Sequence, residues 1–290
     1  MLFAPECEPC IKRQIQEAIE LLKADQKLAA TITKKTDELF TRLDEFSHGL
    51  EFAAAAHELV AQLAGNADVY KEMKTDSTKR ALALYPKVKK AVQKQQNPLL
   101  AALKVAAAGN IIDAGALGLN IPVEQALRAA VTEPFGRDDS ALLIEELNEA
   151  KTILIIGDNA GETVFDRLLL EMILQQLGPK ETYYAVRSGP IINDATAEDA
   201  KAAGLDQVAT IFDFGAVLPG MVFHRTSPEF QRLFSIADVV ISKGQGNFEG
   251  QAGMSQRPVY YLLRAKCGPN ARALKVEPGT QVLVRLPAKK

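Results

Sequence analysis

From residue 151 onward, the sequence is dominated by short, dense apolar runs that are separated, at first, by helix-forming segments. The runs read TILIIG, ETYYAV, VATIFDF, ADVVIS, PVYYLL and TQVLVRL. Continuous apolar runs are typical of strands buried on both faces, and their alternation with helices is typical of a parallel sheet with helices packed on each side. The pattern therefore predicts an α/β fold built on a doubly wound, mostly parallel sheet.

Before this point the apolar residues follow a helical period instead. Ile11, Ile15 and Ile19 form one stripe, and the alanine-rich segment EFAAAAHELVAQLAG strongly favours helix. We therefore expect two domains: an all-helical subdomain, a bundle or a cap, over residues 1–148, and an α/β domain over residues 149–290.

The composition is that of an ordinary globular chain of 290 residues, 47% hydrophobic and 24% charged. A net charge of −2 argues against a nucleic-acid partner or a membrane surface, and no apolar stretch approaches the roughly 18 residues of a transmembrane helix. The first residues carry no secretory signal, and three cysteines are too few for a disulfide framework, so we expect a reducing cytoplasm. No pattern indicates an oligomeric state.

Unusual polar side chains follow three of the predicted strands. The segments are 157–162 (GDNAGE), 187–196 (RSGPIINDAT) and 242–249 (SKGQGNFE). In a doubly wound sheet, ligands bind beyond the carboxyl ends of the strands. We therefore expect the three segments to deliver their side chains to one crevice.

Three of these side chains, Asp158, Asn159 and Asp194, are hard oxygen ligands. Two carboxylates and an amide carbonyl suit Mg²⁺ or Mn²⁺, which keep coordination positions open for water and substrate oxygens. The carboxylates alone would repel a phosphate, whereas a divalent ion cancels their charge and can ligate the phosphate. Lys243 adds a positive charge, and the glycine-flanked turn 244–247 lets backbone N–H groups approach phosphoryl oxygens. The sequence therefore predicts a metal–phosphate site.

Each of these features also has a purely structural interpretation. Asp158 and Asn159 could form a helix cap or an Asx-turn, and Asp194 could cap the helix that follows it. Lys243 could simply precede a tight turn. Glu162 lies one helical turn beyond Asp158 and could reach the crevice, or it could only interact favourably with the helix dipole.

Taken together, the segments resemble the DUF89 family, the damage-control phosphatases with the ARMT1-like fold, and in particular its compact prokaryotic branch. GDNAGE with a downstream KGQGN is the specific part of this resemblance, and GNIIDAG and CEPC also fit. The resemblance implies a Rossmann-like α/β/α layer with an additional helical subdomain. It also implies that Asp158, Asn159 and Asp194 are metal ligands, and that Glu162 and Lys243 contact the substrate.

The predicted function is that of a divalent-metal-dependent phosphatase, a phosphoric monoester hydrolase, acting on a small phosphorylated metabolite such as a sugar phosphate, a nucleotide or a cofactor precursor. The metal, Mg²⁺, Mn²⁺, Co²⁺ or Ni²⁺, would polarise the phosphoryl group and orient or activate the attacking water. Direct attack by water and a phospho-aspartyl intermediate both stay open, so no nucleophile is assigned. We assign catalysis to Asp158, Glu162 and Lys243. Substrate or phosphate contacts are assigned to Lys243, Gly244, Asn247, Glu162, Arg187, Ser188, Asn110 and Asp113.

Two further functions stay open. One is an S-adenosylmethionine-dependent carboxyl methyltransferase, because such an activity has been proposed for a eukaryotic branch of the family that the chain resembles. The other is a non-catalytic metabolite-binding protein. Phosphate release with a divalent metal, methyl transfer, or binding without turnover separates the three.

Some of the assigned residues have two interpretations from sequence alone. Arg187 could bind an anion or neutralise Asp194, and Ser188 is a possible hydroxyl donor at the same rim. Asn110 and Asp113 interrupt an apolar helical segment, and they could reach the crevice or merely cap and turn the helix.

The cysteines allow several interpretations. Cys7 and Cys10 form a C-x-x-C pair, which supplies only two of the four ligands of a structural zinc, and Cys267 could be a third if the fold brought it close. Redox chemistry fits less well, because such a pair normally opens a helix that follows a strand. Structural or inert thiols are the simplest alternative.

Overall fold

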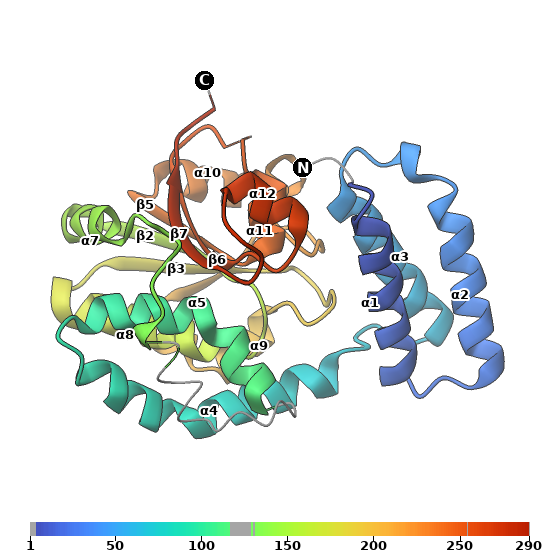
Figure 1. The fold of residues 1–290 in the computed structure, drawn as a ribbon, viewed down its shortest axis with the longest axis horizontal. Helices are drawn as coiled ribbons and strands as arrows, with labels where there is room; N and C mark the ends of the chain where they lie inside the picture. The colour runs from blue at the N-terminus through green and yellow to red at the C-terminus, as the bar shows by residue number, and fades with distance from the viewer. Residues whose placement is uncertain (1–3, 117–128, 130, 254, 290) are drawn as a thin grey trace.

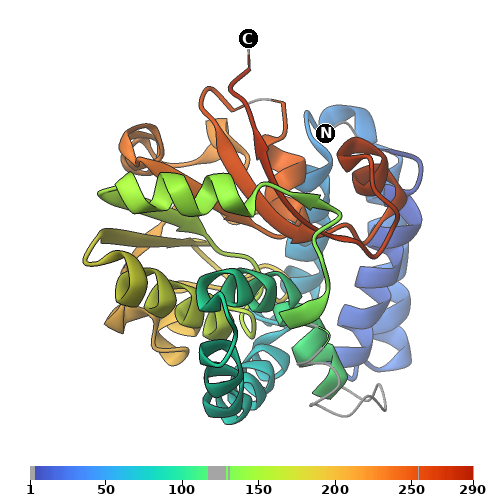
Figure 2. The ribbon, with the colours of Figure 1, turned by 60° about the vertical axis from the view of Figure 1, so that its left-hand side comes forward.

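The computed structural model describes residues 4–116, 129, 131–253 and 255–289, and for residues 110–116 it describes the backbone alone. These residues form one sheet with helices on both faces and a group of helices beside it (Figures 1 and 2). Within the described part of the chain, no helix is long and apolar enough to cross a membrane.

The sheet confirms the predicted mixed α/β class. Within the described residues it contains seven strands in the order β1-β7-β6-β5-β2-β3-β4, and all neighbours are parallel except β6 and β7. Each of the six apolar runs forms a strand. The strands are β1 (Arg137–Asp138), β2 (Thr152–Ile156), β3 (Glu181–Val186), β4 (Thr210–Asp213), β5 (Val239–Lys243), β6 (Val259–Arg264) and β7 (Gln281–Leu286).

Alternate residues of the central strand β2 belong to two different cores. Ile153 and Ile155 pack in a core with helices on one face of the sheet, and Leu154 and Ile156 pack in a second core on the other face. All four side chains are fully buried. This is the packing that a continuous apolar run predicts for a strand covered on both sides.

The helices vary widely in length, and those within the α/β part of the chain are mostly short. They are α1 (Cys7–Leu21), α2 (Gln26–Phe40), α3 (Gly49–Ala64), α4 (Lys71–Gln93), α5 (Pro98–Ala116), α7 (Ser140–Glu149), α8 (Thr163–Leu177), α9 (Ala197–Ala202), α10 (Pro228–Ile236), α11 (Gln245–Gln251) and α12 (Gly268–Leu274). Short 3-10 turns occur at Leu43–Glu45, Leu205–Gln207 and Phe223–Arg225.

Helices α1, α2 and α3 stand to one side of the sheet and share a core of their own, which includes Ile11, Ile32 and Phe52 (Figure 1). Helices α4 and α5, in contrast, pack with α8 on the first face of the sheet. The change of period near residue 148 thus precedes β2, the first of the apolar strands, although the short edge strand β1 comes before it. The cores, in contrast, separate α1–α3 from the rest. The division into domains at residues 148 and 149 stays a prediction.

Candidate active site

The loops that follow β2 and β3 are joined by backbone hydrogen bonds beyond the carboxyl ends of these neighbouring strands. The N–H of Ala160 donates to the carbonyl of Asn193 at 2.9 Å, and the N–H of Ala195 donates to the carbonyl of Asp158 at 2.8 Å. Strand β5 pairs with the other side of β2, so its end lies at the same edge. The two hydrogen bonds between the loops therefore fix the backbone around Asp158 and Asp194.

A cavity of about 560 Å³ opens above these strand ends. Its floor contains five of the predicted site residues: Asp158, Asn159, Glu162, Asp194 and Gly244. Its opposite wall comes from the helices beside the sheet and the segment before α12, including Cys7, Cys10, His48, Leu50 and Cys267. The cavity is large enough for a phosphoryl group together with an organic substituent.

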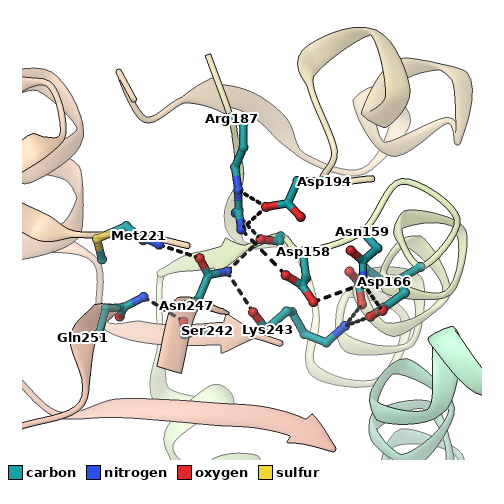
Figure 3. Close-up of polar contacts among 12 residues, drawn as sticks. Asp158, Asn159, Asp166, Arg187, Asp194, Met221, Ser242, Lys243, Asn247 and Gln251 are labelled. Carbon is teal, nitrogen blue, oxygen red and sulfur yellow. Dashed lines mark hydrogen bonds and ion pairs between the residues drawn. The ribbon is translucent and has the colours of Figure 1, made fainter. Parts of the chain in front are cut away.

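Asn159 links two carboxylates on the cavity floor. Its amide Nδ2 donates to Oδ2 of Asp158 at 3.2 Å (Figure 3). The same nitrogen donates to Oε1 of Glu162 at 2.8 Å. Because the amide nitrogen makes these contacts, the orientation of the amide oxygen is set as well. Glu162 is 6% exposed and precedes α8.

Arg187 lies beneath the floor with a side chain that is 0% exposed. Its Nε and Nη2 are each 2.7 Å from Oδ2 of Asp194, and Nη2 is 3.6 Å from Oδ1 of Asp158 (Figure 3). The guanidinium also donates to the carbonyl of Gly157 at 2.7 Å and lies over the ring of Phe214. This geometry fits the neutralisation of Asp194 better than an anion contact.

Lys243 is also buried, with 1% of its surface exposed, rather than reaching into the open crevice. Its ammonium donates to Oδ1 of Asp166 at 2.6 Å and lies 3.7 Å from Oε2 of Glu162. Burial lowers the pKa of Lys243, but the carboxylates of Asp166 and Glu162 outweigh this effect, and the pKa is raised above its ordinary value. The ammonium is therefore a fixed positive charge beneath Glu162.

These side chains form one connected cluster of buried charges, which we call the charge cluster. It contains the carboxylates of Asp158, Glu162, Asp166 and Asp194 and the cations Arg187 and Lys243. With all six ionised, four negative charges face two positive ones, which leaves an excess of two negative charges. Burial, together with Glu162 and Asp194, raises the pKa of Asp158 to about 8.

The excess charge matches one divalent cation, and the oxygen donors of the floor have the chemistry that Mg²⁺ and Mn²⁺ prefer. Among the described residues, no group of three or more His, Cys, Asp or Glu side chains is arranged to hold a metal ion. The predicted ligand set combines two carboxylates with an amide oxygen, so it is not a set of that kind. The residues Asp158, Asn159 and Asp194 fit a hard divalent ion.

Two glycines in the site segments are required by close approaches. Gly244 has a φ of +77°, and a Cβ at this position would overlap the carboxylate of Asp158. A Cβ at Gly157 would lie 2.5 Å from the hydroxyl oxygen of Tyr184. Gly244 thus lets the loops after β2 and β5 approach each other directly, and Gly157 leaves room for the hydroxyl of Tyr184 in β3.

Other predicted site residues lie outside the cavity floor. Asn247 is 0% exposed, and its amide bonds the carbonyls of Gly157 and Lys243 and the N–H of Met221, each at 2.8 Å (Figure 3). Asn247 therefore ties the strand ends together from below. Ser188 is exposed and donates its hydroxyl to Asp213.

Asn110 and Asp113 belong to α5, but their side chains lie outside the described residues. The helix itself approaches the site, because a Cβ at Gly109 would lie 3.2 Å from Cγ of Glu162. The substrate role of these two residues stays a prediction.

The fold brings the three cysteines to the wall of the same cavity, although Cys267 is far from the other two in sequence. All three are free and half-buried. The thiol of Cys10 accepts a hydrogen bond from Arg13 at 3.3 Å, and that of Cys267 accepts one from Asn270 at 3.2 Å.

Asp166 and Tyr184 complete the polar network around Lys243, and neither was predicted from the sequence as a site residue. Asp166 is 0% exposed and accepts a hydrogen bond from the hydroxyl of Tyr184 at 2.7 Å. A signal was available, since Asp166 lies one helical turn after Glu162 within the apolar segment VFDRLLL. A charged residue inside such a segment indicates a buried partner.

The chain matches a family model described as the damage-control phosphatase ARMT1-like domain over residues 3–282. It belongs to this family. The expected resemblance to the DUF89 proteins is thereby confirmed, and the match spans the helices beside the sheet as well as the sheet itself.

Archaeal relatives cover nearly the whole chain. A protein named as a damage-control phosphatase in Pyrococcus horikoshii is 34% identical, over 97% of this chain and 96% of that protein. Another of that name in Archaeoglobus fulgidus is 30% identical, over 97% and 98%. An uncharacterised protein of Methanocaldococcus jannaschii is 34% identical, over 97% and 94%. The crystal structure of a DUF89 family protein from Pyrococcus horikoshii matches with a TM-score of 0.89 at 32% identity and covers 100% of both chains.

Proposed function

We propose that this protein is a divalent-metal-dependent phosphatase that hydrolyses a small phosphorylated metabolite. The observation that carries the proposal is the charge cluster, which has two negative charges in excess when its six groups are ionised and lies at the edge of a parallel sheet where ligands bind. The relatives named as damage-control phosphatases support the same activity.

Asp158, Asn159 and Asp194 would hold the metal, which when bound supplies a Lewis acid for the phosphoryl oxygens and a means of activating water. Arg187 holds Asp194 in place from the side opposite the cavity, and it offsets part of the effect of burial, which raises the pKa of Asp194. Glu162 lines the cavity and is oriented by Asn159, so it is placed to accept a proton or hydrogen bond from a water or a substrate hydroxyl. Lys243 supplies a fixed positive charge behind Glu162.

The cavity supports a substrate that is larger than phosphate alone. Its volume of about 560 Å³ and its mixed wall of apolar, thiol and amide side chains fit an organic group of the size of a sugar or a cofactor fragment. A sugar phosphate, a nucleotide or a cofactor-precursor phosphate are the classes that we propose. The carboxyl methyltransferase and pure binding alternatives gain no support from the named relatives.

The test is a screen of the metal-loaded protein against a panel of phosphate monoesters, with release of inorganic phosphate as the readout. Asp158→Asn should reduce release to background. Asp213→Asn is the matched control, because Asp213 is an exposed carboxylate at the end of β4 whose recorded contacts are with Ser188 and the N–H of Gly215. Methyl transfer from S-adenosylmethionine without phosphate release would contradict the proposal.

A further inference from the structure

A chain of three buried polar side chains runs beneath the cavity floor, from β3 through α8 to β5. Tyr184 donates its hydroxyl to Oδ2 of Asp166 at 2.7 Å, and Lys243 donates to Oδ1 of the same carboxylate at 2.6 Å. Asp166 and Tyr184 are 0% exposed and Lys243 is 1% exposed. The network lies where water cannot replace any of its members.

The ammonium of Lys243 lies between two carboxylates with different positions. Asp166 holds it from the side of the helix core (Figure 3). Glu162, at 3.7 Å, lines the cavity. The shorter contact is to Asp166, so this carboxylate sets where the ammonium lies. The contact to Glu162 is longer than a hydrogen bond and leaves the Glu162 carboxylate directed to Asn159 and the cavity.

A buried ammonium must be paired, because the uncompensated charge costs several kcal/mol. Without Asp166, the nearest available partner of Lys243 among the described residues is Glu162, and a direct contact there would remove one negative charge from the cavity side. The excess charge of the cluster would then fall from two to one. Removal of Asp166 should thus lower the affinity of the cavity for a divalent cation, although Asp166 itself does not line the cavity.

We propose that Asp166 is a positioning residue that neutralises Lys243 and holds it against the underside of Glu162, and that Tyr184 orients Asp166. The role rests on the proposed metal-dependent phosphatase function. It has two parts: a charge part, which preserves the affinity of the cavity for a divalent cation, and a geometric part, which keeps Glu162 available to the substrate.

The charge part is tested with Mn²⁺ alone. Protein that has been freed of metal with a chelator, and then of the chelator, is titrated with Mn²⁺, and free Mn²⁺ is detected by electron paramagnetic resonance. Asp166→Asn keeps the size of the side chain and should weaken Mn²⁺ binding about tenfold or more, since one buried charge is lost close to the cation. Adding Lys243→Met should restore the affinity to within about threefold of wild type, because the double variant again has two charges in excess.

The matched control is Glu171→Gln. Glu171 lies on the same helix but pairs with Lys89 at 2.5 Å and Arg167 at 2.9 Å, away from the cavity. Its removal should leave Mn²⁺ binding within about twofold of wild type, since distant charges are screened by solvent. Equal weakening by Glu171→Gln and Asp166→Asn would show a general loss of charge and overturn the proposal.

The geometric part is tested with Asp166→Glu, which keeps the charge but displaces the ammonium. Mn²⁺ affinity should stay within about threefold of wild type, while kcat on p-nitrophenyl phosphate falls about tenfold or more with a smaller change in KM, the range expected when a charged group is misplaced. Unchanged kcat in Asp166→Glu together with unchanged Mn²⁺ affinity in Asp166→Asn would overturn the proposal.

The wild-type protein separates this inference from the proposed function. If the wild type binds Mn²⁺ and releases phosphate but Asp166→Asn behaves identically, only the role of Asp166 is refuted. If the wild type neither binds Mn²⁺ nor hydrolyses any monoester, both proposals are refuted. If Asp166→Asn does not fold, Asp166→Glu and the double variant still carry the test, because neither leaves an unpaired charge.

Discussion

Replacing Asp158 with asparagine should make the metal-free protein more stable while it abolishes metal binding. Burial and two neighbouring carboxylates raise the pKa of Asp158 from 3.8 to about 8. The unfolded chain releases this proton near pH 4, whereas the folded protein retains it up to about pH 8. The stability of the metal-free protein therefore falls as the pH rises through this window.

The size of the effect follows from the shift. Between pH 3.8 and pH 7 the folded state pays about 1.4 kcal/mol per pH unit for this one group, which amounts to about 4 kcal/mol at pH 7. Asparagine is neutral and keeps the shape of the side chain, so we expect the free energy of unfolding to rise by about 2–4 kcal/mol, or the Tm to rise by roughly 3–7 °C. Thermal unfolding in excess chelator, followed by circular dichroism, measures it.

Asp194→Asn should have the opposite effect and make the metal-free protein less stable. It removes the partner that lies 2.7 Å from the buried guanidinium of Arg187, which cannot lose its charge. Asp158, at 3.6 Å from Arg187, partly replaces Asp194 as the partner of the guanidinium. We therefore expect the free energy of unfolding to fall by about 2 kcal/mol rather than by the full cost of breaking a buried pair. With Mn²⁺ added, the wild type should gain stability and neither variant should. A Tm for Asp158→Asn at or below that of the wild type in chelator would refute the reasoning.

Three smaller predictions concern other parts of the molecule. Burial lowers the pKa of His57 to about 4, so this group should cost the folded state about 3 kcal/mol as the pH falls from 6.5 to 4, and His57→Gln should remove that part of the acid sensitivity in urea titrations. Gly244→Ala should weaken Mn²⁺ binding at least tenfold, because its Cβ overlaps the Asp158 carboxylate at a positive φ; calorimetry showing wild-type affinity would contradict this. Cys7→Ser with Cys10→Ser should keep kcat within about threefold of wild type, since the proposed chemistry uses oxygen ligands and a lysine; loss of turnover in the folded double variant would assign the thiols a role.

The sheet could be predicted from the sequence because its strands are buried on both faces. Runs such as TILIIG consist almost entirely of apolar residues, and this pattern is typical of a strand in a parallel sheet. Strand β1 was missed for the opposite reason: Arg137–Asp138 is two residues long, polar, and held only by pairing with β7 at the edge.

The helices of the first half of the chain could be predicted from the sequence, but the surfaces on which they pack could not. Residues 99–109 of helix α5 are mostly buried and pack in the core over the sheet, whereas α1 and α3 pack with each other through a narrower apolar stripe. Both patterns satisfy a helical period. Which surface a helix covers depends on partners that lie far away in the sequence, and no periodicity in one segment reports them.

The polar residues of the site divide in a similar way. Asp158, Asn159, Glu162 and Asp194 could be grouped because they follow strand ends that meet at one edge of the sheet. The pairing of Lys243 with Asp166 could not be identified, because a charged residue inside an apolar helical segment indicates a buried partner without showing which residue that partner is. Tyr184 lies inside an apolar strand, where the sequence indicates only burial. The structure therefore adds to the site mainly what lies beneath it.

The central claim is that the strand-end oxygens and the excess charge beneath the cavity serve a divalent cation used in phosphate ester hydrolysis. The most direct measurement is phosphate release by the exhaustively chelated protein, with the monoester that it hydrolyses best, before and after addition of Mg²⁺, Mn²⁺, Co²⁺ or Ni²⁺. We predict background release in chelator, full release with at least one of these ions, and no restoration by any of them in Asp158→Asn. Full activity in the chelated wild type, or restored activity in Asp158→Asn, would contradict the claim.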